Sequence, residues 1–314
     1  MPQPDISLII ISLNSRHFLA DCLVSIKNSI WRDKTYEIIV VDNGSTDGTL
    51  ELLAEHPDVR VVANKNNVGF CPAGNQGAKI AVGRYLMFLN DDILIIDDAF
   101  PLLVEFLDAN PQAGMVGSRL FNIDGTDQFS SGRTFPSPMN ALFGRKSVLT
   151  RLFPNAAPAR RYLLSQRVSD NLPYEVDWLS AAAMAVRVDA FNQVGGLVED
   201  FYYFHELIIC DRIKRNGYSV YLDPRSKILH YEGAGSGVRT PRVRRAHVKK
   251  FHIAAYHWFC VHHRISSLNP VRLLIGSVLA GRAAVLMVVE TFKPQSANDK
   301  AQIQVGRPEG GIPI

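Results

Sequence analysis

The chain has 314 residues, of which 47% are hydrophobic and 20% charged. This composition is typical of a globular protein and argues against a disordered or fibrous chain. Four widely spaced cysteines form no CxxC pair, which argues against a zinc or redox motif and is typical of a reducing compartment. The apolar N-terminus lacks a basic region and a cleavage site, so we interpret it as a buried strand and expect a cytoplasmic protein.

Short apolar runs alternate with helical patterns through the first hundred residues. Strands are predicted at 6–13, 36–41, 59–63 and 85–89, and helices at 18–26, from about 46 to 55, and at 72–80. Such alternation indicates a parallel sheet with helices on both faces. The sequence therefore predicts an α/β fold with a Rossmann-like, mostly parallel sheet and a helical C-terminal appendage.

Polar residues follow these strands at the ends where an open α/β sheet binds ligands. They are Asn14 after the first strand, Asp42 after the second, residues 64–67 after the third and Asn90-Asp91-Asp92 after the fourth. The paired carboxylates suit Mg²⁺ or Mn²⁺, which would neutralise a diphosphate leaving group. Asp42 suits a ribose or a base. Helix capping is the alternative for each of these acids.

Several common nucleotide and hydrolase motifs are absent from the sequence. The first strand is not followed by GxGxxG, and neither GxxxxGK[ST] nor GxSxG occurs. Dinucleotide-binding, P-loop and α/β-hydrolase interpretations therefore lose support.

The middle of the chain is less regular. Asp124-Gly125 predicts a hairpin turn, and residues 145–170 are interpreted as an excursion over the site. A helix is predicted at 206–215, ending at an Asn-Gly pair, and strands at 218–222 and 227–230.

The character of the sequence changes after about residue 240. Six basic residues between 239 and 250 favour an anionic partner, and the absence of an aromatic platform argues against nucleic acid. The apolar segment 271–289 is interrupted by arginines and glycines, so an interfacial helix on an anionic membrane fits better than a spanning one. A core-packing helix is the alternative. We predict domains at 1–240 and 241–292 and a disordered tail at 293–314.

Four segments of the N-terminal half occur in a characteristic order: SLIIISLNS, EIIVVDNGSTDGT, NKNNVGFCPAGNQG and YLMFLNDDI. They are followed by Val176-Asp177-Trp178-Leu179, Gly195-Gly196 and His230. Together they resemble the inverting family 2 glycosyltransferases, specifically the rhamnosyltransferase-like branch, over about residues 5 to 240.

The resemblance implies a GT-A fold that uses a nucleotide-diphosphate sugar and Mg²⁺ or Mn²⁺. The donor would be dTDP-rhamnose, and the acceptor a saccharide or lipid-linked saccharide in polysaccharide or cell-wall assembly. The N-terminus, the basic cluster and the apolar segment 271–289, rather than the resemblance, predict a cytoplasmic protein with peripheral contact at the inner face of the plasma membrane. The implied site residues are the donor-binding Asn14, Asp42, Asn67, Asn75 and Asp91, the metal-binding Asp92 and His230, Trp178 and His205 in the acceptor or sugar region, and Glu206 as catalytic base.

The sequence departs from the family pattern at the start of the predicted 206–215 helix. His205 replaces a usual Glu, Glu206 replaces the Asp expected as general base, and Ile208 replaces a further acid. Glu is one methylene longer than Asp, and a misplacement of about 1 Å can cost on the order of a hundredfold in rate.

These departures leave other interpretations open. His205 is an alternative base, since its ordinary pKa of about 6.5 suits the task. A nucleotide-sugar-binding protein that keeps the fold but has weakened catalysis is the main rival. A nucleotidyltransferase would need a Gly-rich, basic loop after the first strand, and SLNSRHF is not one.

Overall fold

The computed structural model describes residues 3–128, 131–136, 152–153, 171–199, 203–231 and 241–292. The chain divides into two compact units. Unit 1 comprises Met1–Phe201 and His205–Glu232, and unit 2 comprises Tyr202–Phe204 and Gly233–Ile314. The predicted excursion at 145–170, apart from residues 152–153, and the predicted tail at 293–314 lie outside the described residues.

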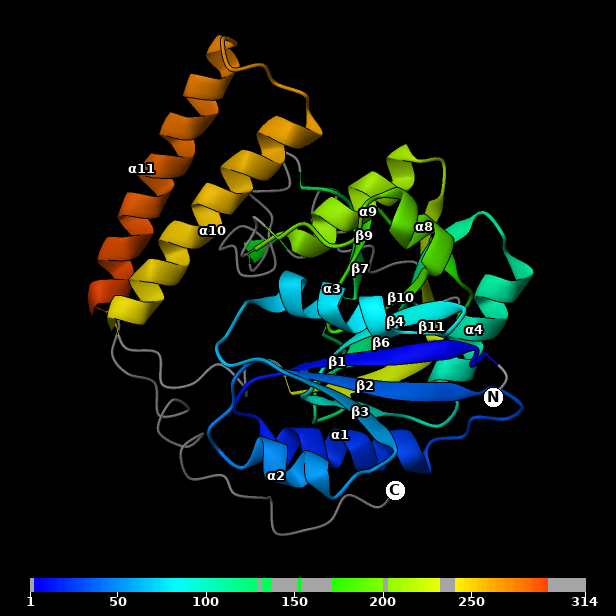
Figure 1. Cartoon of the computed structure of the whole chain (residues 1–314). Coiled ribbons are helices and arrows are strands. Elements are labelled where there is room, and N and C mark those ends of the chain that lie inside the picture. Colours follow the sequence, from blue (N-terminus) through cyan, green and yellow to red (C-terminus); the bar gives the residue numbers. More distant parts are fainter. Residues whose placement is uncertain are drawn as a thin grey trace. The chain divides into compact units, whose positions relative to one another are not determined.

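Unit 1 is built on a sheet of nine strands within the described residues, ordered β3-β2-β1-β4-β10-β6-β11-β5, with β8 paired to β11. The strands β1, β2, β3 and β4 are parallel, as predicted (Figure 1). Their bounds are β1 Ile6–Ser12, β2 Tyr36–Asp42, β3 Val59–Ala63, β4 Tyr85–Asn90, β5 Ile93–Ile95, β6 Ala113–Phe121, β8 Tyr174–Glu175, β10 Ala183–Arg187 and β11 Ser219–His230.

The far half of the sheet is mixed, because β10 runs antiparallel to both β4 and β6. Strand β11 then pairs parallel to β6, with a register shift between Asp223 and Lys227. This irregularity lies between the two strands that the sequence predicts at 218–222 and 227–230, so the structure contains one bent strand there. A two-stranded ribbon joins β7 (Gly132–Arg133) to β9 (Trp178–Leu179).

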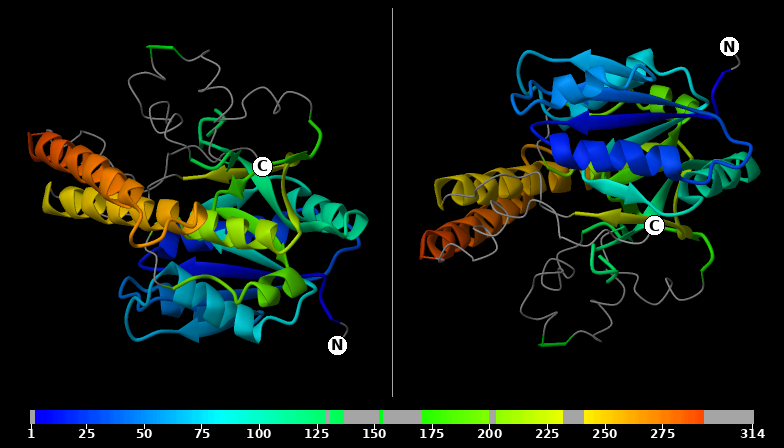
Figure 2. Two further views of the ribbon diagram at one scale, coloured as in Figure 1. Left: turned by 90° about the horizontal axis from the view of Figure 1, so that it is seen from above. Right: turned by 90° about the horizontal axis from the view of Figure 1, so that it is seen from below.

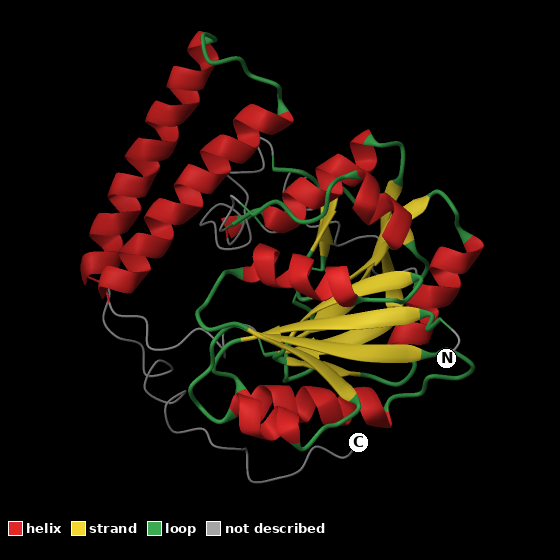
Figure 3. Cartoon of the chain, in the orientation of Figure 1, coloured by secondary structure: helices red, strands yellow, loops and turns green. Residues whose placement is uncertain are grey.

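Helices cover both faces of the sheet, as the red helices above and below the yellow strands show (Figure 3). One face carries α1 (Arg16–Asn28), α2 (Thr49–Ala54) and α4 (Ala99–Ala109). The other carries α3 (Phe70–Ile80), α8 (Val188–Gln193) and α9 (His205–Arg215). The views from above and below show these two helical layers separately (Figure 2).

The core follows from the two-residue repeat of the strands. Leu8, Ile10, Met87 and Leu89 point to the face covered by α1 and α4 and are fully buried in one apolar cluster. Ile9 and Phe88 are fully buried too and approach the glycines of α3 on the opposite face. Burial on both sides explains why these strands are continuous apolar runs rather than alternating ones.

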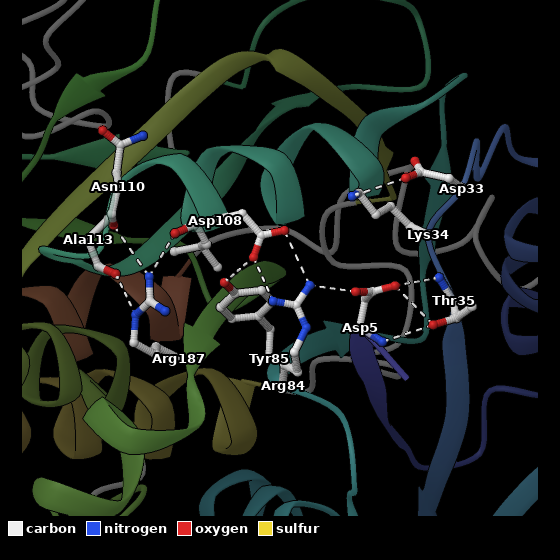
Figure 4. A network of polar contacts seen from close by, with 11 residues as sticks. Asp5, Asp33, Lys34, Thr35, Arg84, Tyr85, Asp108, Asn110, Ala113 and Arg187 are labelled. Carbon is white, nitrogen blue, oxygen red and sulfur yellow. Dashed lines mark hydrogen bonds and ion pairs between the residues drawn. The ribbon is translucent and has the colours of Figure 1, made fainter. Parts of the chain in front are cut away.

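A polar network ties together the edge of the sheet where the parallel strands begin (Figure 4). The Arg84 guanidinium donates to Asp108 at 2.7 and 3.2 Å and to Asp5 at 2.5 Å, and the Tyr85 hydroxyl donates to Asp108 at 2.7 Å. Arg187 donates to the Leu107 carbonyl at the end of α4. Ion pairs thus stabilise the end of the sheet where the parallel strands begin. The polar groups described below lie at the opposite end, where these strands end.

Unit 2 contains a helical hairpin of α10 (Pro241–His262) and α11 (Pro270–Phe292). Asn269 caps α11 by accepting the Val271 N–H at 2.9 Å. Helix α11 is long and apolar enough to cross a membrane, and only 6% of its most apolar 18-residue stretch is buried in the protein. Among the described residues, this helix is mostly exposed, which argues against the alternative of a core-packing helix. Length and composition alone do not separate a spanning helix from one lying at a membrane interface.

Candidate active site

The end of β2 is built around the buried carboxylate of Asp42. One oxygen, Oδ2, accepts the backbone N–H groups of Gly44 and Ser45 at 3.1 and 3.0 Å. The other, Oδ1, is buried and accepts no hydrogen bond within the described part of the chain. Asp42 therefore shapes its own turn with one oxygen, while its second oxygen is buried without a hydrogen-bond partner among the described residues.

The Asn14 side chain joins the end of β1 to the same turn. The side-chain Oδ1 accepts the Thr46 backbone N–H at 2.8 Å, and the backbone N–H of Asn14 donates to the Ser45 hydroxyl at 2.8 Å. The positive φ of Asn14, 50°, is one that Asn tolerates better than most residues. Asn14 therefore holds the turn after β2 in place, whether or not it also touches a donor.

Side-chain amides link β2 and β3 to the start of α3. The Asn64 amide exchanges two hydrogen bonds with Gln76 and donates to Asn43 Oδ1 at 3.1 Å. Asn67 accepts the Gly69 N–H at 2.8 Å in a tight turn directly before α3. These contacts fix the loop that the sequence assigns to the donor.

Asp91 is buried beside the end of β1. Burial raises the pKa of its carboxyl to about 7, the facing Ser12 and Ser15 hydroxyls lower it, and the negative charge of Asp92 raises it further. Neighbouring carboxylates that do not easily both ionise are typical of sites that receive a cation or a proton.

Asp92 meets His230 at the end of β4, and these two come from segments far apart in the chain. Asp92 Oδ1 lies 3.3 Å from His230 Nε2, and the Asn90 amide nitrogen lies 3.3 Å from the same ring nitrogen. The far side of the ring is held by Gln128, whose Oε1 lies 3.0 Å from Nδ1 and whose amide donates to the His230 carbonyl at 2.7 Å. Because the Gln128 Oε1 can only accept a hydrogen bond, this contact favours a proton on Nδ1 and leaves Nε2 facing Asp92 and Asn90.

The cluster at the end of β4 offers two groups that can bind a metal ion, a carboxylate and an imidazole. No set of three or more His, Cys, Asp and Glu side chains at metal-binding spacing occurs among the described residues. Yet Asp92 Oδ1 is buried without a hydrogen bond within those residues and faces a ring nitrogen that can act as a ligand. Mg²⁺ and Mn²⁺ sites that use one or two protein ligands are completed by substrate phosphates and water. Asp92 and His230 fit that kind of site, and Gln128 orients the ring by its contacts with Nδ1 and the carbonyl of His230.

The first turn of α9 places His205 and Glu206 against the start of α3. The His205 ring stacks on Phe70, with centroids 4.6 Å apart, and its Nδ1 lies 3.5 Å from Glu206 Oε2. Both His205 nitrogens and Glu206 Oε2 are buried and make no hydrogen bond in the described ranges. Burial and the charges of Glu206 and Glu199 raise the pKa of Cys71 to about 12, which keeps that neighbouring thiol neutral.

Asn75 and Trp178 both have defined partners. The Asn75 amide donates to the Leu197 carbonyl and to Glu199 at 2.9 and 3.0 Å, and its oxygen accepts the Leu197 N–H. It therefore fastens the loop before α9 to α3. The buried Trp178 indole donates to the Thr134 carbonyl at 3.0 Å, and the Arg133 guanidinium lies 4.3 Å from its ring centre.

The structure thus forms two neighbouring groups from the predicted residues. Asn14, Asp42 and Asn67 share the amide-linked loops next to Phe70 and His205, while Asp91, Asp92 and His230 share the end of β4. The Asn43 N–H donates to the Ser12 carbonyl and joins the two groups at the end of β1. Sequence reasoning missed Gln128 as a ligand-orienting residue and Phe70 as the platform under His205. Gln128 contacts His230, which is 102 positions away, and Phe70 contacts His205, which is 135 positions away. No local sequence pattern predicts contacts between residues so far apart.

The fold is that of the GT-A glycosyltransferases. A mannosyltransferase from Pyrobaculum calidifontis, solved with GDP-mannose and Mn²⁺, aligns with a TM-score of 0.56 at 18% identity, over 96% of this chain and 84% of that one. A GalNAc-T7 structure solved with UDP, GalNAc and Mn²⁺ aligns with a TM-score of 0.56 at 16% identity, over 73% of this chain and 44% of that one. At these identities the likeness establishes the fold alone.

The family is established by sequence. Residues 7–181 match the glycosyl transferase family 2 description, so the chain belongs to that family. It is 27% identical to the N-acetylglucosaminyl-diphospho-decaprenol L-rhamnosyltransferase of Mycobacterium tuberculosis over 293 residues, covering 89% of this chain and 92% of the relative. It is also 28% identical over 214 residues to a PGL/p-HBAD biosynthesis glycosyltransferase of Mycobacterium bovis, covering 63% and 80% respectively. The predicted fold and family resemblance are confirmed.

Proposed function

We propose that this glycosyltransferase is a metal-dependent, inverting rhamnosyltransferase that moves rhamnose from dTDP-rhamnose to a lipid-linked saccharide in cell-wall or polysaccharide assembly. The observation that carries the proposal is the facing pair of Asp92 Oδ1 and His230 Nε2 at the end of β4, 3.3 Å apart and held by Gln128. The likeness to a rhamnosyltransferase along most of the chain supports the choice of sugar and acceptor.

In the proposed reaction Glu206 acts as the general base. It takes the proton of an acceptor hydroxyl, the hydroxyl oxygen forms a bond to the anomeric carbon, and the bond from that carbon to the diphosphate oxygen breaks with its electron pair. A base without a competing hydrogen bond suits this role, as Glu206 Oε2 has none within the described residues. His205, stacked on Phe70, restricts where Glu206 can point.

The donor is held by the remaining strand-end groups. Asp42 Oδ1 would accept from the ribose or base, and the loop fixed by Asn14, Asn67 and Asn75 would enclose the nucleotide. Asp92 and His230 would hold Mg²⁺ or Mn²⁺, and Asp91 would add negative charge beside them. Such a cation supplies charge stabilisation for the departing diphosphate.

We further propose where the acceptor binds and which part of the chain contacts the membrane. Trp178 and the first turn of α9 are assigned to the acceptor region. The basic stretch of α10 and the exposed apolar surface of α11 support peripheral contact with an anionic inner membrane face.

The test compares two aspartate variants of the full chain. Asp92→Asn keeps the shape of the side chain but removes its charge, and Asp33→Asn changes an exposed acid far from the strand ends. With dTDP-rhamnose, Mn²⁺ and a diphosphate-lipid acceptor, we expect Asp92→Asn to lose at least about a hundredfold in dTDP release, and Asp33→Asn to match the parent. Equal rates would refute the role of Asp92.

A second comparison separates enzyme from binding protein. Glu206→Gln should still bind the donor in titration calorimetry while transfer is lost. If the parent chain binds the nucleotide sugar but releases no dTDP with any acceptor, the rival interpretation of a nucleotide-sugar-binding protein replaces the enzyme.

A further inference from the structure

A groove of about 390 Å³ runs along the α10–α11 hairpin, entirely within unit 2. Its volume lies in the range of roughly 300–1,000 Å³ typical of small-molecule sites. Its walls are almost wholly apolar. They include Ile253 and Tyr256 from α10 and Leu279, Ala280, Ala283 and Met287 from α11.

Three polar pairs cross between the helices and brace them along their length. Arg244 pairs with Glu290 at 2.9 Å, Arg282 lies 3.0 Å from His252, and Arg272 donates to the Tyr256 hydroxyl at 2.9 Å. These long side chains span the gap between the helices at positions spread along the hairpin, so the groove does not depend on one contact.

Three of the five α11 residues that line the groove are small, the other two being Leu279 and Met287. Gly276, Ala280 and Ala283 recur at helical spacing and lie on the groove. A Cβ added at Gly276 would come within 3.4 Å of the Tyr256 ring. Small residues between two helices normally let the helices close on each other. Here long arginine side chains bridge the helices and three of the α11 residues on the groove are small, and a volume of about 390 Å³ is left for an apolar guest.

The hairpin presents two different apolar surfaces. Leu274, Val278 and Val285 are 63%, 61% and 64% exposed, do not line the groove and lie on the opposite side of α11 by helical spacing. A flat exposed face of this kind suits bulk bilayer lipid. The groove is walled on two sides by helices, and that shape suits one hydrocarbon chain.

Positive charge stands at the rim of the groove. Lys249 lines it, and Arg245 lies one turn earlier on the same basic helix. Lys249 forms no ion pair with any described residue. A cation beside an apolar groove matches a hydrocarbon chain that ends in an anionic group, because the chain is buried while the charge is neutralised.

We propose that this groove binds the isoprenoid chain of a polyprenyl-diphosphate-linked acceptor, with Lys249 facing the phosphates. The inference rests on the proposed function for the choice of acceptor, and the relative that acts on a diphospho-decaprenol spans 89% of this chain. The hairpin is then a substrate-binding part of the enzyme as well as a membrane contact.

The test uses geranylgeranyl diphosphate, below its micelle concentration, titrated into the full chain without donor. Ala280→Trp places a large ring in the groove from an exposed position, and Val285→Trp places the same ring on the opposite face. We expect Ala280→Trp to weaken binding at least tenfold and Val285→Trp to stay within twofold of the parent, with helicity unchanged in both. Equal binding by both variants, or no binding by the parent, would overturn the proposal.

A charge comparison and a competition complete the test. Lys249→Ala should remove most of the preference for geranylgeranyl diphosphate over geranylgeraniol, whereas Lys250→Ala, on the neighbouring residue that does not line the groove, should keep it. Equally potent displacement of the probe by a short-chain anionic phospholipid, kept below its micelle concentration so that the probe stays in solution, would assign the groove to bulk lipid instead. Because no donor is present, these results are independent of the Asp92 experiment, so a failure here is distinct from a failure of the proposed function.

Discussion

Helix α3 lies so close to the sheet that one added methyl group should displace it. A Cβ built at Gly77 would lie 2.4 Å from Ile9 Cγ2 and 3.3 Å from Val41 Cγ2. Non-bonded carbons rest at about 3.5–4.0 Å, so α3 would have to move outward by roughly 1 Å. Ala gains about 1 kcal/mol over Gly in a helix, while overpacking costs about 1–3 kcal/mol. We expect Gly77→Ala to destabilise unit 1 by about 1 kcal/mol.

The sign of this effect should reverse when the clashing atom is removed. In an Ile9→Ala background the new methyl group at residue 77 enters the cavity that Ile9 leaves, so Gly77→Ala should stabilise by about 0.5–1 kcal/mol. The double-mutant cycle would then give a coupling energy of about 2 kcal/mol. Urea unfolding measures it, in a Trp258→Phe background where the remaining Trp31 and Trp178 both report on unit 1.

The same displacement has a functional consequence. The start of α3 carries Phe70, on which His205 stacks, so a 1 Å shift of α3 alters the surroundings of the proposed base. Gly77→Ala should therefore lower the transfer rate by more than its effect on stability explains, up to about a hundredfold. A destabilisation of equal size in both backgrounds, or a more stable single variant, would refute the close-packing argument.

Three further predictions concern stability. Arg84→Met should cost only about 1 kcal/mol at pH 7, because its pairs with Asp5 and Asp108 are partly exposed. Burial raises the pKa of Asp5, but the hydrogen bonds from Arg84 help to lower the pKa values of both Asp5 and Asp108 below their ordinary range. In urea titrations across pH, the parent should therefore lose stability below about pH 4 more steeply than the variant. Asn75→Ala, which frees the loop before α9, should cost about 1–3 kcal/mol by thermal unfolding. Burial lowers the pKa of His252, although its hydrogen bond to a backbone carbonyl acts in the opposite direction. Protonation of His252 below about pH 6.5 should therefore destabilise the hairpin, and faster hydrogen exchange in α10 would measure this.

The parallel half of the sheet could be predicted because its signals are local. The strand 59–63 matches β3 residue for residue, and β1, β2 and β4 differ from prediction by one residue at their C-terminal ends. Continuous apolar runs bounded by polar residues specify these strands almost without tertiary information. The hairpin turn at Asp124-Gly125 is confirmed for the same reason, with Gly125 at a φ of 80°.

The rest of unit 1 depends on contacts that no window of sequence contains. Strand β6 lies in the segment predicted to be irregular, and its two glycines weaken the strand pattern. A Cβ at Gly114 would meet Tyr218 at 2.7 Å, and one at Gly117 would meet Leu179 at 2.6 Å. Only glycine leaves room at these two positions for side chains that lie far away in the sequence. The antiparallel direction of β10 likewise follows from its partners β4 and β6 rather than from its own residues.

The same division explains which parts of the candidate site were visible in the sequence. Asp42 and Asp92 follow buried parallel strands, and the geometry of such a sheet brings strand ends to one edge whatever the rest of the chain does. Glu206 and His205 lie instead on a helix that reaches this region through Phe70, Asn75 and the loop at Leu197. Three departures from the family pattern, at His205, Glu206 and Ile208, occur on that helix, whereas Asp42 and Asp92 keep their acids at the strand ends. If the proposed roles hold, the helix can change its acid–base groups while the strand ends proposed to face the diphosphate keep their geometry, so altered acceptor chemistry is expected before any loss of donor binding.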